Sequence, residues 1–198
     1  MPKQTGMWLT LLLVFLFIAP HVRAEDKLTP TIKVSADGFP VGHETPEGVA
    51  ADLARAFIGR DVNLFDDTCI KPFTGGQSRE EYSAFLKETV ENIRNEAQRK
   101  ESVGPKEILK VFAARSLSRN GPASYGFAAF GFQDVKFVDV LTLLHNGKKH
   151  ENRTLVIKDK AGKWYVHPLP GSSPLLSIGL NDESESKIEF AEVYKVQK

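Results

Sequence analysis

Two polar residues lie inside segments that are otherwise apolar, and they are the first candidates for chemistry. Asp139 lies within the apolar run of residues 137–141, and Tyr125 lies within residues 124–132, where aromatic and small side chains alternate. A buried carboxylate must be paired or neutral. Asp139 therefore either faces a ligand site, or faces solvent, or pairs with a lysine or arginine on the next strand. The sequence leaves these alternatives open.

Other residue types that support catalysis or metal binding form no recognisable pattern. No Gly-x-Ser-x-Gly stretch is present for a nucleophilic serine. The histidines lack the four-residue spacing of a helical metal pair, so we expect no metal and no cofactor. Cys69 is the single cysteine, which we expect to be a small buried hydrophobe. A reactive thiol or an intermolecular disulfide is the alternative.

The first residues have the three parts of a secretory signal peptide. Lys3 is followed by an apolar run at residues 8–19, and the small residue Ala24 stands at the expected cleavage edge. The apolar run is shorter than the roughly 20 residues that a membrane-spanning helix needs. We therefore predict cleavage after residue 24, no stable membrane anchor, and a secreted or periplasmic location.

The chain is nearly neutral, with 26 basic and 25 acidic side chains among its 198 residues. Such a balance lacks the basic footprint of a nucleic-acid-binding protein, so we expect no nucleic acid as a partner. After the signal peptide at residues 1–24, the length is that of one domain. We divide it into an extended arm at residues 25–44, a folded domain at 45–169, and a C-terminal extension at 170–198 with an edge strand at 188–196.

Helical patterns come first in the folded domain. Thr45 and Pro46 predict the start of a helix, and apolar residues at four-residue spacing continue it to Gly59, expected to be the left-handed stop. A short helical turn is expected within residues 61–73. A capping box at residues 78–81 then opens a second, longer helix.

After Pro105 the pattern becomes that of strands. We predict them at residues 108–117, 124–132, 135–145, 153–158 and 163–169. Asn146 and Gly147 form a strong hairpin signal. Since consecutive strands joined by tight turns pair antiparallel, we expect an α+β fold, with the N-terminal helices packed on a curved, mostly antiparallel β-sheet.

The order of these elements resembles the nuclear-transport-factor-2-like superfamily, which has a cone-shaped α+β fold. The resemblance spans residues 45–169 and rests on the helix end at 56–61, the short element at 64–67 and the hairpin that closes at 162–166. It implies that ligands bind between the helices and the concave face of the sheet. It also implies that acid/base members hold a carboxylate there beside a tyrosine or histidine.

Together these features predict an apolar pocket within the cone. The predicted helices carry apolar stripes, and small residues beside aromatics leave room in the strand at 124–132. The expected lining comprises six residues: Phe57, Tyr82, Tyr125, Phe127, Asp139 and Trp164.

Two functional hypotheses follow. The first is a non-catalytic binding module for a small apolar ligand or a protein partner, with a homodimer through the sheet as a further interaction. The second is a small acid/base enzyme of the isomerase, dehydratase or cyclase type, in which Asp139 is the base and Tyr125 donates a hydrogen bond. The lack of a second convincing acid/base partner favours the first hypothesis.

Overall fold

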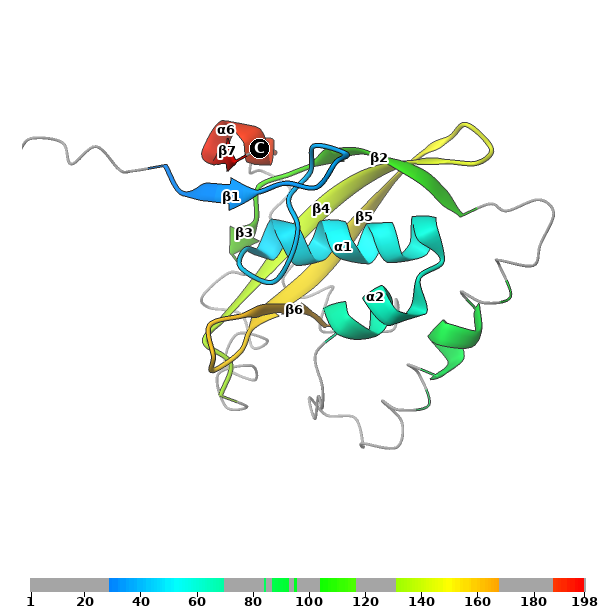
Figure 1. Ribbon diagram of the computed structural model, residues 1–198, viewed down its shortest axis with the longest axis horizontal. Coiled ribbons are helices and arrows are strands. Elements are labelled where there is room, and N and C mark those ends of the chain that lie inside the picture. Colours follow the sequence, from blue (N-terminus) through cyan, green and yellow to red (C-terminus); the bar gives the residue numbers. More distant parts are fainter. Residues whose placement is uncertain are drawn as a thin grey trace, which may run out of the picture.

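The protein combines helices with a mostly antiparallel sheet, which confirms the predicted α+β class (Figure 1). The computed structural model describes residues 29–69, 84, 87–92, 95, 104–116, 131–167 and 187–197. The predicted signal peptide and residues 124–130 of the strand predicted at 124–132 lie outside these residues, while residues 131 and 132 are described and are not in a strand. Of the predicted second helix only residues 84, 87–92 and 95 are described, and all of them are helical.

Helix α1 (Pro46–Gly59) begins where the sequence predicts and ends one residue later than predicted. The hydroxyl of Thr45 accepts a hydrogen bond from the backbone N–H of Gly48 at 3.0 Å, and proline occupies the first turn, where its missing N–H costs nothing. The left-handed stop is Arg60 (φ 54°), so the expectation that Gly59 would adopt this conformation is wrong. Gly59 instead completes the last helical turn.

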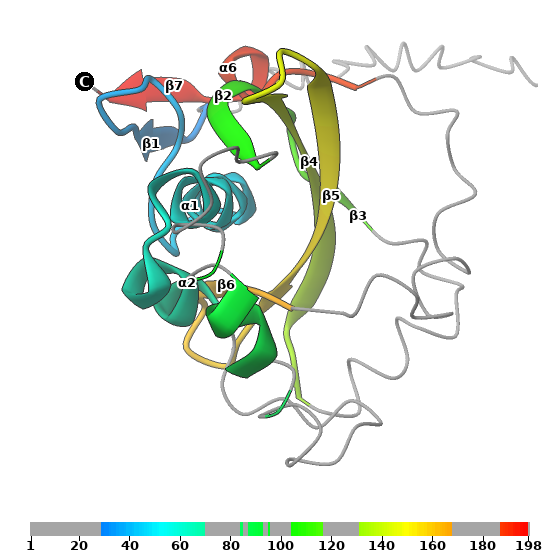
Figure 2. The ribbon, with the colours of Figure 1, turned by 90° about the vertical axis from the view of Figure 1, so that its right-hand side faces the viewer.

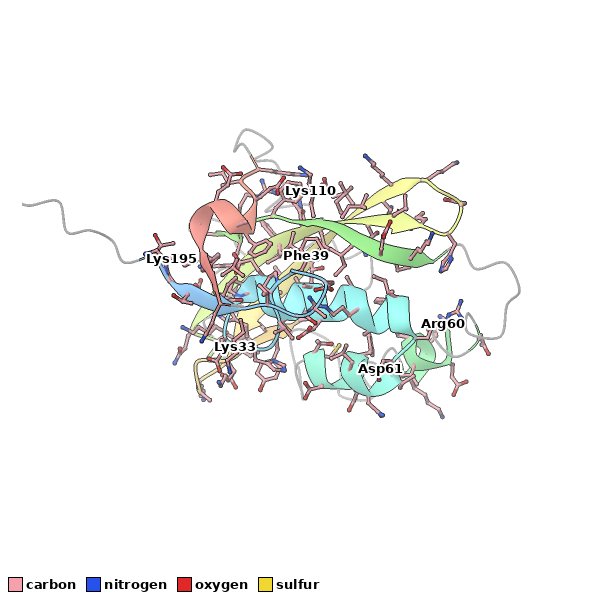
Figure 3. The ribbon with its side chains drawn as sticks, turned by 45° about the horizontal axis from the view of Figure 1, so that its top comes forward. Lys33, Phe39, Arg60, Asp61, Lys110 and Lys195 are labelled. Atoms are coloured by element: carbon pink, nitrogen blue, oxygen red, sulfur yellow. The ribbon has the colours of Figure 1, made fainter. Side chains whose placement is uncertain are left out.

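The position of this stop is explained by the next helix. Asp61 caps α2 (Val62–Thr68), because its carboxylate accepts hydrogen bonds from the backbone N–H groups of Asn63 and Leu64. Arg60 and Asp61 lie together at the α1–α2 junction (Figure 3). A left-handed residue directly before Asp61 reverses the chain so that both helices are capped at adjacent residues.

The main sheet has five strands: β2 (Pro105–Val111), β3 (Arg115–Ser116), β4 (Asp134–Leu144), β5 (Lys149–Lys158) and β6 (Trp164–Val166). The order is β2-β4-β5-β6, with β3 also paired to β4, and every pairing is antiparallel. Gly147 and Gly162 adopt positive φ in the two hairpin turns, and the first of these turns is the one that the Asn146-Gly147 signal predicts. The hairpin register places Asp139 directly opposite Arg153.

The single strand expected at residues 108–117 is interrupted between β2 and β3. The backbone N–H of Phe112 donates to the carbonyl of Asp139, while that of Ala113 donates to the carbonyl of Ile188. The N–H of Ala114 donates to the side chain of Glu47. Because three successive donors bond to three different parts of the chain, a continuous ladder cannot form here.

Strands β4 and β5 curve around α1, which lies against their concave face (Figure 2). The main core is formed between them by apolar residues of α1 and of the sheet: Val49, Ala50, Ala51, Val111, Val138, Val140, Val156, Trp164 and Val166. Ile32 and Phe190 belong to the same core cluster. The arm and the C-terminal extension therefore both contribute to the core.

The two ends of the described chain form a second, smaller sheet. Strand β1 (Thr31–Lys33) pairs in parallel with β7 (Lys195–Gln197), and the short helix α6 (Phe190–Val193) precedes β7. Of the edge strand expected at residues 188–196, only residues 195 and 196 are in a strand, as part of β7. Four of these nine residues form α6, with the side chain of Phe190 in the core, and the strand that follows pairs with β1.

No helix within the described residues is long and apolar enough to cross a membrane.

Candidate functional site

The described residues of the predicted pocket do not come together. Trp164 is buried in the main core, on the α1 side of the sheet. Phe57 is half-buried near the C-terminal end of α1. The centroids of its ring and of the Phe65 ring lie 5.7 Å apart, in an edge-on arrangement. Asp139 lies on the opposite face of the sheet from α1, because its neighbours Val138 and Val140 point into the main core. Tyr82, Tyr125 and Phe127 lie outside the described residues.

Asp139 is the centre of a group of charged side chains that we call the Asp139 cluster, formed by Asp139, Arg115, Arg153, Lys187 and Glu151. Arg153 donates from Nε to Oδ1 of Asp139 at 2.7 Å and from Nη2 to Oδ2 at 3.2 Å. Arg115 donates from Nη2 to Oδ2 at 2.6 Å. Lys187 Nζ lies 3.6 Å from the same Oδ2 and also pairs with Glu151. Of the open alternatives for Asp139, the structure shows pairing with an arginine on the next strand.

The surroundings of Asp139 keep it ionised. Burial by itself would raise the pKa of Asp139, but the hydrogen bonds from Arg153 and the positive charges of Arg153, Lys187 and Arg115 outweigh burial and lower the pKa below its usual value. A carboxylate held in this way is a weak base. In this structure Asp139 is therefore poorly suited to abstract a proton at neutral pH.

A second buried carboxylate, Glu47, was missed by the sequence analysis. It lies in the first turn of α1 with its side chain inside the protein, where Oε1 accepts from the backbone N–H of Ala114 at 2.6 Å. The hydroxyl of Tyr194 lies 3.3 Å from Oε1 and 3.2 Å from Oε2. Glu47 thus connects α1, the β2–β3 link and the residue between α6 and β7.

Burial raises the pKa of Glu47, and the hydrogen bonds from Ala114 and Tyr194 and the charge of Lys136 only partly offset it. The pKa of Tyr194 is also raised, by burial and then by the adjacent Glu47. A carboxyl group with a raised pKa that lies beside a tyrosine has the composition of an acid/base pair. In the pattern that predicts the start of α1, Glu47 is an ordinary acidic residue of the first helical turn. No sequence signal distinguishes this buried glutamate from a solvent-exposed glutamate at the same position.

Two further sets of polar contacts, one around Arg55 and one at His43, hold the segment before α1 in place. Arg55 donates to both carboxylate oxygens of Asp37 at 2.8 Å and to Asp52 at 2.5 Å, while Asp52 also accepts from the backbone N–H of Gly42 at 2.7 Å. His43 Nδ1 lies 2.7 Å from the carbonyl oxygen of Trp164. These contacts attach the chain before α1 both to the helix and to the sheet edge at β6.

Metal ligation finds no support in the described part of the chain, where no three His, Cys, Asp or Glu side chains are grouped to hold an ion. Cys69 is buried beside Ala56 and Phe65. His167 is buried as well, and burial lowers its pKa to about 4. At neutral pH the His167 imidazole is therefore uncharged.

No family model matches this sequence, and neither a curated protein nor a solved structure matches it significantly.

Proposed function

We propose that the protein is exported and works outside the cytoplasm as a non-catalytic binding module with the cone-shaped nuclear-transport-factor-2-like fold. The signal-peptide pattern of residues 1–24 supports export. The curved antiparallel sheet around α1 and the order of α1 and α2 before the strands β2 to β6 support the fold. The occupant is a small ligand or a protein partner.

One observation carries the non-catalytic assignment: each buried carboxylate in the described residues is engaged by donors of the protein itself. These carboxylates are Glu47, Asp52 and Asp139. Glu47 is held by Ala114 and Tyr194, Asp52 by Gly42 and Arg55, and Asp139 by three basic side chains. A general base must come within hydrogen-bonding reach of the substrate proton, and these contacts occupy the groups that would do so.

An acid/base enzyme is the second candidate, and Glu47 is the observation that favours it. The raised pKa of Glu47 and its contact with Tyr194 suit proton transfer better than the lowered pKa of Asp139 does. The side chain of Glu47 is 0% exposed, however. A substrate could reach it only if Tyr194 and the α6–β7 segment moved away, which makes this candidate the weaker one.

Protein recovered from its native compartment tests the proposal directly. N-terminal sequencing is expected to begin at Glu25, and native mass spectrometry is expected to detect a bound ligand or partner. Recovery of intact residues 1–24 in a membrane fraction would contradict export. Incubation of the bound molecule with fresh protein should leave it unchanged; conversion that is lost in Glu47→Gln would establish the enzyme instead.

A further inference from the structure

The C-terminal segment, residues 187–197, is bonded to the rest of the protein near both of its ends. At its start the carbonyl oxygen of Ile188 accepts a hydrogen bond from the backbone N–H of Ala113 at 2.7 Å. Near its end the backbone N–H of Lys195 donates to the carbonyl oxygen of Pro30 at 3.0 Å. These two backbone N–H groups therefore report whether the segment is attached.

Between these two bonds, the segment contacts a buried titratable group. The hydroxyl of Tyr194 lies 3.2 Å from Oε2 of Glu47 and 3.3 Å from Oε1, and the side chain of Glu47 is 0% exposed. The backbone N–H of Ala114 donates to Oε1 at 2.6 Å. Both of these partners are uncharged. The attachment of the segment and the protonation state of Glu47 thus depend on one shared contact.

The charged groups on the surrounding elements do not pair with Glu47 within the described residues. Lys136 on β4 contributes its positive charge, but its Nζ lies 3.7 Å from Asp134 instead. Neighbouring charged groups on the other elements are engaged with different partners: Asp52 with Arg55, Arg115 with Asp139, Glu189 with Lys110, Lys187 with Glu151, and Lys158 over the ring of Trp164. A negative charge on Glu47 is therefore poorly compensated.

The two protonation states of Glu47 differ in how well this site accommodates them. In the protonated state Oε2 can donate to the Tyr194 oxygen while Oε1 accepts from Ala114, so every group in the contact is neutral. In the ionised state the site holds a buried charge, which is costly unless a cation or water reaches it. The pKa values of Glu47 and Tyr194 are both raised, so Glu47 is the member of the pair that ionises first as pH rises.

We propose that the C-terminal segment is a pH-sensitive latch, which is held on α1 while Glu47 is protonated and loosens when Glu47 ionises. Displacement of Tyr194 lets water reach the carboxylate, so ionisation favours the open form. The contribution of Glu47 to closing is complete below its ordinary pKa of 4.5 and is lost as pH rises through its raised pKa in the closed form. This inference does not depend on the proposed binding function.

Amide hydrogen exchange of the full mature protein between pH 5 and pH 8 tests the latch, with the N–H groups of Lys195 and Ala113 as probes. After correction for intrinsic exchange rates, their protection factors should fall at least about threefold from pH 5 to pH 7. The fall should not exceed about tenfold per pH unit, because opening releases one proton. His167 cannot produce it, since a pKa of about 4 makes the protein more stable as pH rises from 5.

The Glu47→Gln variant cannot ionise at this position, so the same protection factors should be independent of pH. The matched control is Lys195→Gln, which changes an exposed lysine on β7 and should keep the wild-type pH dependence. The N–H of Asp61, which donates to the carbonyl of Ala56 at 2.8 Å, is an internal reference. Asp61 is well separated from Lys195 in Figure 3, and its protection should not fall with rising pH.

Equal protection of the two probes at pH 5 and pH 7 in the wild type, or a fall that persists in Glu47→Gln, overturns the proposal. If circular dichroism shows that Glu47→Gln does not fold, Tyr194→Phe is the second variant. Loss of the hydroxyl should lower the protection of the Lys195 N–H at pH 5 by about fivefold, the usual effect of one hydrogen bond. Unchanged protection in that variant also overturns the latch. Because the experiment uses no ligand, either result leaves the proposed binding function as it stands.

Discussion

Glu47 and Asp139 are both buried carboxylates on the central elements of this fold, yet their pKa values move in opposite directions. Burial is the largest influence on each and raises both pKa values. Around Asp139 two arginines and a lysine reverse that effect. Around Glu47 the partners are a backbone N–H and a tyrosine hydroxyl, both neutral, with Lys136 as a more distant charge.

The difference shows that hydrogen bonds alone do not offset the cost of burying a charge. Glu47 accepts a short hydrogen bond and lies in the first turn of a helix, where the macrodipole favours a negative charge. Even so, its pKa stays raised. Nearby positive charge is what separates the two sites, and the following predictions test that explanation from the largest expected effect to the smallest.

Asp139→Asn should destabilise the protein most, by about 3 kcal/mol. The amide keeps the shape of the side chain but leaves three cations around a site without its negative charge, and breaking a buried pair costs about 3–5 kcal/mol before allowance for the partial exposure of these cations. Urea unfolding at pH 7 measures the change. A loss below about 1 kcal/mol would mean that the cations are satisfied by water and that Asp139 is not their anchor.

His167 should make the protein sensitive to acid. Burial lowers its pKa from 6.5 to about 4, so between these pH values the unfolded chain binds a proton that the folded protein does not. Stability therefore falls as pH falls from 6.5, by about 2 kcal/mol at pH 5, since each pH unit corresponds to about 1.4 kcal/mol. His167→Phe should flatten this part of the pH profile in thermal unfolding; an unchanged slope would refute the assignment.

Asp139 adds to acid sensitivity at lower pH. Because its folded pKa lies below the ordinary value of 3.8, its contribution is complete above that value and is lost as pH falls through the folded pKa. The His167→Phe variant should therefore still lose stability in acid, but only below pH 4.

Tyr194→Phe should cost about 1 kcal/mol, the usual contribution of one hydrogen bond. Glu47 keeps its hydrogen bond to Ala114 but loses the hydroxyl that joins it to the C-terminal segment. If a protease cleaves the chain after α6 faster in Tyr194→Phe than in Lys195→Gln, the contact between Tyr194 and Glu47 holds the C-terminal segment in place. Equal rates in the two variants would show that Phe190 and the β1–β7 pairing hold it alone.

Glu47→Gln should change stability at neutral pH by less than about 1 kcal/mol, in contrast to Asp139→Asn. The amide can accept the same two hydrogen bonds and removes a charge that burial disfavours. The folded pKa of Glu47 is raised, so its contribution is complete below the ordinary value of 4.5 and is lost as pH rises through the folded pKa. Relative to wild type, the variant should therefore gain stability as pH rises, and a loss instead would contradict the neutral-partner explanation.

Local chemistry explains the parts of this fold that were predictable. Helix α1 begins at Pro46 because Thr45 can cap it, and the β4–β5 hairpin forms where Gly147 permits positive φ. Once that turn is placed, the antiparallel register puts Asp139 opposite Arg153, in agreement with one of the alternatives that the sequence left open, a lysine or arginine on the next strand. Each of these features depends on residues close together in the chain.

The sequence by itself therefore determined the α+β class, the start of α1 and the β4–β5 hairpin turn, and it left the partner of Asp139 open. Tertiary structure alone decided the face on which Asp139 lies and its contacts with Arg115 and Lys187. It also decided the burial of Glu47, whose partner Tyr194 is 147 residues away. Such contacts form only when the sheet curves around α1 and the two ends of the described chain pair, and no local periodicity encodes which distant side chains that closure brings together.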